Sequence, residues 1–445
     1  MNKTEKMLCK PEFPLIAEFW ITSLIPLVLY SAFTLTDAYF VSRFAGTEAL
    51  GGISIVLPFT VIQGTVSQAL GGGSSVFVSR YLGQGDNEKA SRTALNAMLA
   101  FWTTALLITA LGLIFADPIL KILGASGNVY VHAKKYYLIL ITGNVFSTGF
   151  SSIIRAEGAT AYGTLIWVIP ISLNIVFDYI FVVAFGYGVA GSAYATLICQ
   201  VASFLMSLIF FAKLSVLNFK GLKPNFYELK PILKTGIPSL VLSAGIAFTL
   251  ALVNNALSIF GEPGNVSIYA YANRLISFAV MPFTAFVNTV IPLCGANHAA
   301  GSRERSLKIL KLSCVMSVAV GLLLALLLCF LSDTLTAIFT DNQSIISSVQ
   351  YIMKIISPSL IVMPLPMIFG AFCQTTGKTK KSLIFYALST IISAVIILPS
   401  SFIMGSMGTY IAASASYFIA FPLSCLLIVN ELKKYNNTKK SDIPI

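Results

Sequence analysis

Residues 163–188 read "GTLIWVIPISLNIVFDYIFVVAFGYG", and residues 381–408 repeat this pattern as "KSLIFYALSTIISAVIILPSSFIMGSMG". The end of the first copy, "GVAGSAYAT", matches "GTYIAASAS" at the end of the second. Nearer the start, "IPLVLYSAFTLTDAYFVSRFAG" at 25–46 has an echo in "IPSLVLSAGIAFTLALVNNALSIFG" at 237–261. The chain therefore contains two copies of one arrangement, both running in the same direction.

The composition places these copies in a membrane. Of the 445 residues, 56% are hydrophobic and only 10% are charged, whereas a soluble domain has about 25% charged residues. Apolar stretches long enough to span a bilayer recur along the chain. We predict twelve transmembrane helices, at 14–42, 50–81, 90–116, 130–154, 162–185, 190–212, 232–260, 267–295, 306–331, 344–372, 380–403 and 409–430.

The repeat and the spans together predict the domain organisation. We expect an all-α polytopic membrane protein with two six-helix bundles, related by a parallel pseudo-two-fold repeat. The expected parts are an N-terminal lobe at 1–212, a cytoplasmic linker at 213–231, a C-terminal lobe at 232–430 and a cytoplasmic tail at 431–445. Parallel repeats of this kind are a transporter architecture, in which the substrate is held between the halves.

The distribution of Lys and Arg predicts the orientation. If the N-terminus is cytoplasmic, 23 of the 29 basic residues fall in segments on that side. The remaining six are Arg43, Lys121, Lys134, Lys135, Arg274 and Lys354. Cytoplasmic loops are enriched in Lys and Arg, so we expect both termini in the cytoplasm. The net charge of +12 follows from these short clusters and indicates no nucleic-acid partner.

Several kinds of chemistry find no support in the sequence. The seven cysteines form no CxxC, and His132 and His298 are far from each other in the chain, so no metal site of that kind is expected. The "GKT" at 377–379 lacks the upstream glycine of a phosphate-binding loop. We therefore expect no enzyme and no cofactor, and the N-terminus shows no pattern of a cleaved signal peptide.

Two aspartates lie well inside predicted spans, where a charge costs at least a few kcal/mol. Asp37 is nine residues before Gly46 and Asp178 is eight before Gly186, each glycine marking the outer end of its helix. At about 1.5 Å per residue, both acids lie roughly 12–14 Å below the outer turn. Carboxylates inside a membrane usually serve a function.

Two further polar residues reach the same level. Asn174 is one helical turn from Asp178 on the same face, and Thr196 lies at a similar depth in the next helix. We predict that these four residues form a cation-coupling site. Their oxygens suit Na+, whereas the two carboxylates alone suffice to share a proton; each residue could instead satisfy a buried contact between helices.

The second copy lacks both acids, because Thr249 and Ile397 occupy the matching positions. Neither acid is therefore needed to build six helices, and the predicted ion site is one-sided. Pro26, eleven residues before Asp37, removes a backbone donor within its helix and is either a hinge or a static kink. Residues that could line a substrate cavity are Tyr30, Tyr39, Gln63, Gln68, Asn144, Asn254, Asn255 and Arg274.

Three stretches resemble a known family. They are "LPFTVIQGTVSQALGGGSSVFVSRYLGQGDNEKA", "LNIVFDYIFVVAFGYGVAGSAYAT" and "VIPLCGANHAAGSRERS". They look like the characteristic stretches of the multidrug and toxic compound extrusion (MATE) family, in its bacterial branch with the acidic site in the N-terminal half. The resemblance covers essentially the whole chain. It implies that Asp37, Asn174, Asp178 and Thr196 match the cation-binding residues of that half.

The resemblance implies export of amphiphilic, often cationic drugs or toxic compounds from the cytoplasm in exchange for H+ or Na+. We expect H+, because two acids suffice to bind it. We further expect a monomer in the bacterial cell (inner) membrane, with the lipid bilayer and small amphiphilic molecules as its partners. The alternatives are a flippase for a lipid-linked saccharide, which would need a strongly cationic cavity, and a channel or receptor.

Overall fold

The computed structural model describes residues 3–45, 47–123, 125, 127–146, 150–225, 227, 229–262, 265–340 and 342–437. Within these ranges, every regular element is a helix and none is a strand. The prediction of an all-helical membrane protein is confirmed.

Ten helical segments of the described chain are long and apolar enough to cross a membrane. They are Glu12–Phe33, Asn87–Ile114, Val129–Ala156, Thr160–Ala184, Val189–Lys213, Leu229–Phe260, Ile268–Ala299, Arg303–Ala337, Gln343–Thr375 and Thr379–Leu432. The sequence predicted twelve. Helix α3 (Thr47–Gly83) covers the predicted span 50–81 but is not among the ten. The last segment covers two predicted spans.

That last segment is interrupted at one residue. Helix α15 runs from Thr379 to Asn437, and Gly405 within it has φ 60° and ψ −141°. A positive φ of this size favours glycine, because a Cβ would meet the neighbouring carbonyl. Gly405 therefore divides α15 into two helical parts, at the place where the sequence predicted the turn between 380–403 and 409–430.

The chain folds into two compact units. One comprises Met1–Thr4 and Ile25–Gly236, and the other comprises Glu5–Leu24 and Ile237–Ile445. Three helices contribute residues to both units: α1 (Lys3–Cys9) changes unit after Thr4, α2 (Glu12–Phe44) after Leu24 and α10 (Leu229–Phe260) after Gly236.

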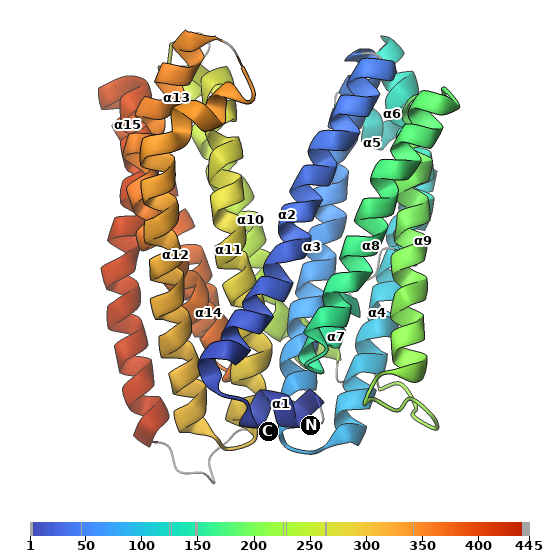
Figure 1. Ribbon diagram of the computed structural model, residues 1–445, viewed down its shortest axis with the longest axis vertical. Coiled ribbons are helices and arrows are strands. Elements are labelled where there is room, and N and C mark those ends of the chain that lie inside the picture. The colour runs from blue at the N-terminus through green and yellow to red at the C-terminus, as the bar shows by residue number, and fades with distance from the viewer. Residues whose placement is uncertain are drawn as a thin grey trace. The chain divides into compact units, whose positions relative to one another are not determined.

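The first unit contains α2 from Ile25 onward and the helices up to the first turns of α10 (Figure 1). After α2 and α3 follow α4 (Asn87–Ile114), α5 (Ala116–Ile122), α6 (Gly127–Gly143), α7 (Phe150–Ala156), α8 (Thr160–Asp178) and α9 (Val189–Lys213). A π-helix at Tyr179–Ala184 continues α8 without a break.

The second unit contains residues 5–24 and the second half of the chain, from Ile237. Its helices are α1 from Glu5, the first part of α2, the rest of α10, α11 (Asn265–Ala299), α12 (Arg303–Ala337), α13 (Gln343–Ile356), α14 (Pro364–Thr375) and α15. Helix α14 packs against α11 and α15, and all of its residues are buried.

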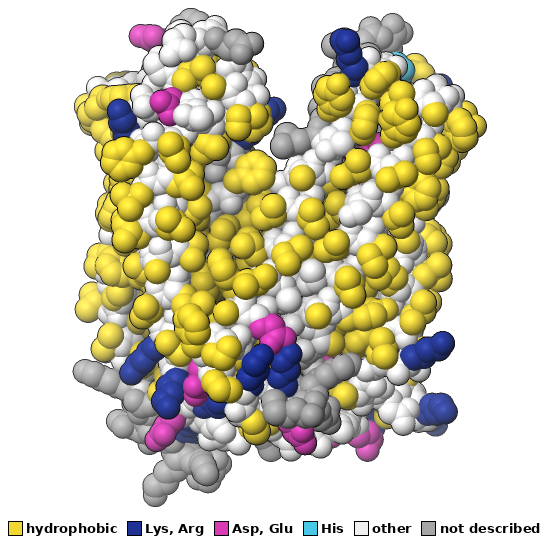
Figure 2. Space-filling view, in the orientation of Figure 1, with side chains coloured by type: hydrophobic (Ala, Val, Ile, Leu, Met, Phe, Trp, Pro, Cys, Tyr) yellow, Lys and Arg dark blue, Asp and Glu magenta, His cyan; other side chains and the backbone are white. Residues whose placement is uncertain are grey.

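Helix α12 illustrates how these helices suit a membrane. Large apolar side chains along it are exposed, for example Val315 (67%), Leu323 (63%) and Phe330 (69%). The face drawn in Figure 2 shows hydrophobic side chains along the length of the helices. In water such a surface would be an aggregation liability, whereas against lipid it is the expected exterior.

Close helix contacts in the first unit depend on glycine. A Cβ on Gly73 of α3 would lie 2.0 Å from the Ile232 carbonyl oxygen, and one on Gly236 would lie 1.8 Å from the Ala69 carbonyl oxygen. The backbones of α3 and the first turns of α10 therefore touch at both places. Small residues allow this in membranes, where packing rather than the hydrophobic effect joins helices.

The turn between α3 and α4 shows why α4 begins where it does. Gly85 has φ 79°, and the Asp86 side chain accepts a hydrogen bond from the Lys89 N–H at 3.0 Å. Asp86 thereby caps the first turn of α4. The Lys89 N–H, together with the Lys89 side chain, holds the pKa of the Asp86 carboxyl below its usual range.

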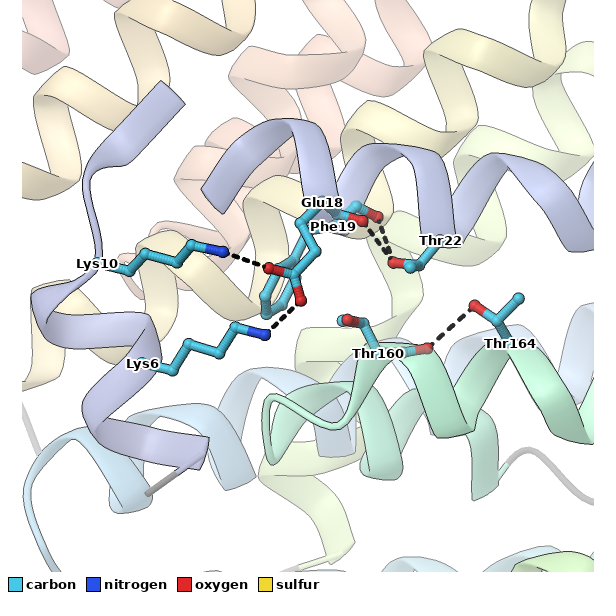
Figure 3. Close-up of polar contacts among 7 residues, drawn as sticks. All are labelled: Lys6, Lys10, Glu18, Phe19, Thr22, Thr160 and Thr164. Carbon is cyan, nitrogen blue, oxygen red and sulfur yellow. Dashed lines mark hydrogen bonds and ion pairs between the residues drawn. The ribbon is translucent and has the colours of Figure 1, made fainter. Parts of the chain in front are cut away.

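Ion pairs within the second unit hold the beginning of α2 in place. Lys6 and Lys10 both bind the Glu18 carboxylate, Lys10 at 2.7 Å (Figure 3). Arg305 at the start of α12 pairs with Glu12 at 3.5 Å. The first turns of α2 are thus bound to α1 and α12.

Candidate functional site

Asp37 lies in the C-terminal part of α2 and is almost fully buried, with 8% of its surface exposed. The Ser192 hydroxyl of α9 donates a hydrogen bond to Asp37 Oδ1 at 2.6 Å. Ser192 itself is completely buried. Among the described residues, Ser192 is the one side chain that donates to Asp37.

Asp178 is the last residue of α8 and is completely buried. In the amide orientation that satisfies both polar atoms of Asn174, its Nδ2 donates to Asp178 Oδ2 at 2.9 Å. Its Oδ1 then accepts from the Thr196 N–H at 3.1 Å. Asp178 Oδ1 has no hydrogen-bond partner among the described residues. This buried oxygen is open to a cation or a proton.

The backbone around Asp178 is unusual. The π-helix begins at Tyr179, directly after the acid. Single π-helical turns inside α-helices are rare and occur frequently at functional sites.

Local glycines place α9 against this segment. Gly188, with φ 58°, precedes the first residue of α9. A Cβ on Gly191 would lie 2.9 Å from the backbone of Phe181 in the π-helix, so the absence of a side chain permits this approach. The next residue is Ser192, and Thr196 is one turn further on the same face. Both site residues of α9 are positioned by this contact.

Apolar packing holds α2 beside α9. Val41, one turn after Asp37, belongs to a buried cluster with Val189 and Ala193 of α9 and Tyr136 of α6. Val189 and Ala193 flank Ser192 in α9, so the faces that carry Asp37 and Ser192 also share apolar contacts.

Sequence reasoning missed two residues of this site. Ser192 lies four positions before Thr196, and the same i, i+4 rule that linked Asn174 to Asp178 could have found it. Tyr136, with 7% of its surface exposed, lies within electrostatic range of Asp37 and Asp178. No sequence signal separates Tyr136 from the neighbouring Tyr137.

The four predicted coupling residues occupy one region of the first unit, with different roles. Asn174 contacts Asp178 through its side chain, whereas Thr196 contributes its backbone N–H to Asn174. Asp37 is joined to α9 through Ser192.

The predicted cavity residues of the first unit are dispersed. Tyr30 and Tyr39 are exposed, at 51% and 59%. Gln63 Nε2 is buried without a partner in the described chain, and the Gln68 side chain lies outside the described residues. Asn144 is buried, and its Nδ2 donates to the Ala105 carbonyl of α4 at 3.2 Å. Asn144 thus contacts another helix.

In the second unit, Asn254 is half-buried, and Asn255 donates to the Ala251 carbonyl of its own helix at 3.0 Å. The Arg274 guanidinium lies over the Phe339 ring, 5.5 Å from its centroid. A cavity role for these residues stays a prediction.

The donor set of the site is made of oxygen. Within the described residues, no three His, Cys, Asp or Glu side chains form a cluster that could hold a metal ion. Two carboxylates with one orphaned oxygen suit a proton, or a hard cation whose shell backbone and water complete. An all-helical, repeatedly membrane-spanning chain with such an acid pair has the features of an ion-coupled membrane transporter.

Comparison with known proteins identifies the family of transporters to which the chain belongs. The MatE family profile matches residues 23–180 and 238–399, and the chain belongs to this family, that of the MATE transporters. The prediction of the family is confirmed, and the protein is a transporter rather than an enzyme. The family match does not support the flippase, channel or receptor alternatives.

Two kinds of relative illustrate the match. The multidrug export protein MepA of Staphylococcus aureus (strain MRSA252) is 26% identical over 423 residues, covering 94% of this chain and 92% of that protein. The crystal structure of MATE in complex with MaL6 has a TM-score of 0.92 at 22% identity, covering 98% of this chain and 100% of that one. An outward-facing MATE transporter of the MOP superfamily gives 0.89 at 22% identity, covering 98% of each chain. The structural matches show the fold.

Proposed function

We propose that this protein exports amphiphilic, often cationic, compounds from the cytoplasm in exchange for H+. Membership of the MATE family supports a multidrug exporter, as does the similarity to multidrug export proteins named MepA along nearly the whole chain. Broad export of this kind needs an energy source, and a cation gradient is the source that a buried acid pair can use.

One observation carries the proposal: two buried carboxylates on different helices lie within electrostatic range, and the described residues provide no hydrogen-bond partner for one of their oxygens. Asp37 is on α2 and Asp178 on α8. The orphaned Asp178 Oδ1 indicates that the site is completed by something it binds. A bound cation would satisfy this oxygen and reduce the repulsion between the acids.

The transport cycle depends on a difference in cation affinity between two conformations of the protein. A cation from outside neutralises the Asp37 and Asp178 pair, which favours a rearranged α2 and release of the drug outside. Return of the cation to the cytoplasm resets the site. Coupling requires that the two conformations bind the cation with different affinities.

Pro26 is the proposed hinge of this rearrangement. It lies inside α2, two residues after Leu24, where the helix passes from one compact unit to the other. Proline lacks the N–H that would complete the helical hydrogen bond at this position, so bending there breaks no bond at that residue.

We further propose twelve transmembrane spans, with both termini in the cytoplasm of a bacterial cell and a monomer as the working unit. Helix α3 and the break of α15 at Gly405 support the two spans beyond the ten. The proposed lobes are 1–212 and 232–430, joined by a cytoplasmic linker at 213–231 and followed by a tail at 431–445.

The contact that Thr196 makes favours H+ over Na+ as the coupling ion. Thr196 contributes its backbone N–H to Asn174, and among the described residues its hydroxyl forms no hydrogen bond with Asp37, Asp178 or Asn174. Fewer oxygen ligands are then assured for Na+, which needs about five or six. A proton needs only one acid.

Transport by the purified protein in proteoliposomes tests the proposal. Export of a fluorescent lipophilic cation, such as ethidium, should follow an imposed pH gradient without Na+. A response to neither a pH nor a Na+ gradient would reject the antiporter, and a response to Na+ alone would replace H+ with Na+.

A further inference from the structure

The hydrogen bond between Ser192 and Asp37 differs from the other polar contact of the acid pair. Asn174 and Asp178 belong to the same helix, α8, so their hydrogen bond does not depend on how α8 packs against other helices. Ser192 belongs to α9 and Asp37 to α2, 155 positions apart. This bond forms only while the C-terminal part of α2 lies against α9.

The Ser192 hydroxyl has one proton, and this proton forms the hydrogen bond to Asp37 Oδ1. Serine is a donor of a single hydrogen bond, and the described chain offers the completely buried Ser192 Oγ no other acceptor at bonding distance. A donor that binds an ionised carboxylate stabilises its negative form. Any cation that approaches Asp37 competes with this donor for the same negative charge.

The charged and titratable groups that face Asp37 come from three helices. Asp178 of α8, Tyr136 of α6 and Tyr30 of α2 itself lie within its electrostatic range. None of these is a cation, and the described residues provide no basic side chain that neutralises Asp37. Ser192 is therefore the group that offsets its charge when the coupling cation is absent.

We infer that Ser192 is a positioning residue of the coupling site, whose hydroxyl holds Asp37 against α9 and weakens its affinity for the coupling cation. An antiporter must release its cation in each cycle, so a site that binds too tightly is slow. The inference rests on the proposed ion coupling of this acid pair.

The test is Ser192→Ala in the full-length protein, reconstituted in proteoliposomes. The half-saturating concentration of the coupling cation, K0.5, and the maximal rate of ethidium export are measured. H+ and Na+ are each varied with the other held constant. Because the lost hydrogen bond stabilised the charged carboxylate, we expect K0.5 to fall about tenfold. The maximal rate should fall as well, since release becomes slower.

Two variants control for a merely structural effect. Ser207 is also completely buried in α9, but its hydroxyl donates to the Ser203 carbonyl of the same helix at 2.9 Å. Ser207→Ala should leave K0.5 and the rate unchanged. Ser192→Thr, which keeps the hydroxyl, should restore K0.5 towards the parent value.

An unchanged or increased K0.5 in a folded Ser192→Ala protein would overturn the inference while leaving ion coupling intact. If the parent protein responds to neither cation, the proposed function itself fails, and the inference fails with it.

Discussion

The Ser215 hydroxyl binds the Glu157 carboxylate, lying 2.8 Å from one oxygen and 2.9 Å from the other. The Val216 N–H also donates to Glu157 Oε2, at 3.0 Å, and Leu217 is buried in the core of the first unit. The start of the segment expected to be a linker, 213–231, is therefore docked on the first unit.

Glu157→Gln should loosen this docking, because an amide oxygen replaces two charged acceptors and the amide nitrogen faces donors. Trypsin should then cleave after Lys220 several times faster in detergent-solubilised protein, while the overall fold stays unchanged. The control is Glu88→Gln, which removes an ion pair with Arg92 whose Glu88 side chain is 70% exposed. Equal cleavage rates in parent and Glu157→Gln would contradict the role of Glu157.

Asp37→Asn should abolish export while the protein still folds. The second copy of the repeat manages without this acid, and removing a buried charge does not by itself destabilise a protein strongly. Ethidium accumulation in cells that express each variant measures the effect, with Asp333→Asn near the end of α12 as the control. Efflux by Asp37→Asn at the parent rate would show that Asp37 does not couple transport.

Asn174→Ala and Thr196→Ala should differ in their effects. Asn174→Ala removes the side-chain partner of Asp178 and should weaken cation-driven export, whereas Thr196→Ala keeps the N–H that binds Asn174 and should be mild. Cation dependence of export in proteoliposomes measures both. If Thr196→Ala instead raises the Na+ requirement as much as Asn174→Ala, the Thr196 hydroxyl is a ligand and Na+ is the coupling ion.

The orientation can be checked by labelling single cysteines in a background without the native ones. Lys223, Lys380 and Glu262 are exposed, so a cysteine at each is accessible to a reagent. From the distribution of basic residues, Lys223→Cys and Lys380→Cys should react only from the cytoplasmic side, and Glu262→Cys only from outside. Reaction of Lys223→Cys with an impermeant reagent in intact cells would invert the topology.

The cap at Asp86 makes the start of α4 sensitive to acid. Because the pKa of Asp86 is lowered in the folded protein, its contribution is present above the unfolded value of about 4 and is lost as pH falls through the folded pKa. Asp86→Ala should speed hydrogen exchange at the Lys89 amide at neutral pH and remove this pH dependence. Exchange that depends on pH equally in both proteins, after correction for intrinsic rates, would rule out the cap.

The break within α15 shows what the sequence pattern could predict about this helix and what it could not. Two predicted spans, 380–403 and 409–430, lie on either side of Gly405, which the apolar pattern and the glycines of "GSMG" indicate. The pattern could not reveal that helical structure continues to both sides of Gly405 with almost no loop, because that depends on the φ and ψ of this one residue.

The sequence by itself determined the helical class, and it showed the repeat and the two acids within predicted spans, since each follows from composition or from spacing along one helix. The pairing of Asn174 with Asp178 belongs here too, because residues four apart share a helical face. Only the tertiary structure decided that Ser192 binds Asp37, that Tyr136 lies near both acids and that Thr196 uses its backbone. These contacts join different helices, and which side chains meet depends on how closely the backbones approach. At this site the approach is set by Gly191, whose missing side chain lets α9 touch the π-helix after Asp178.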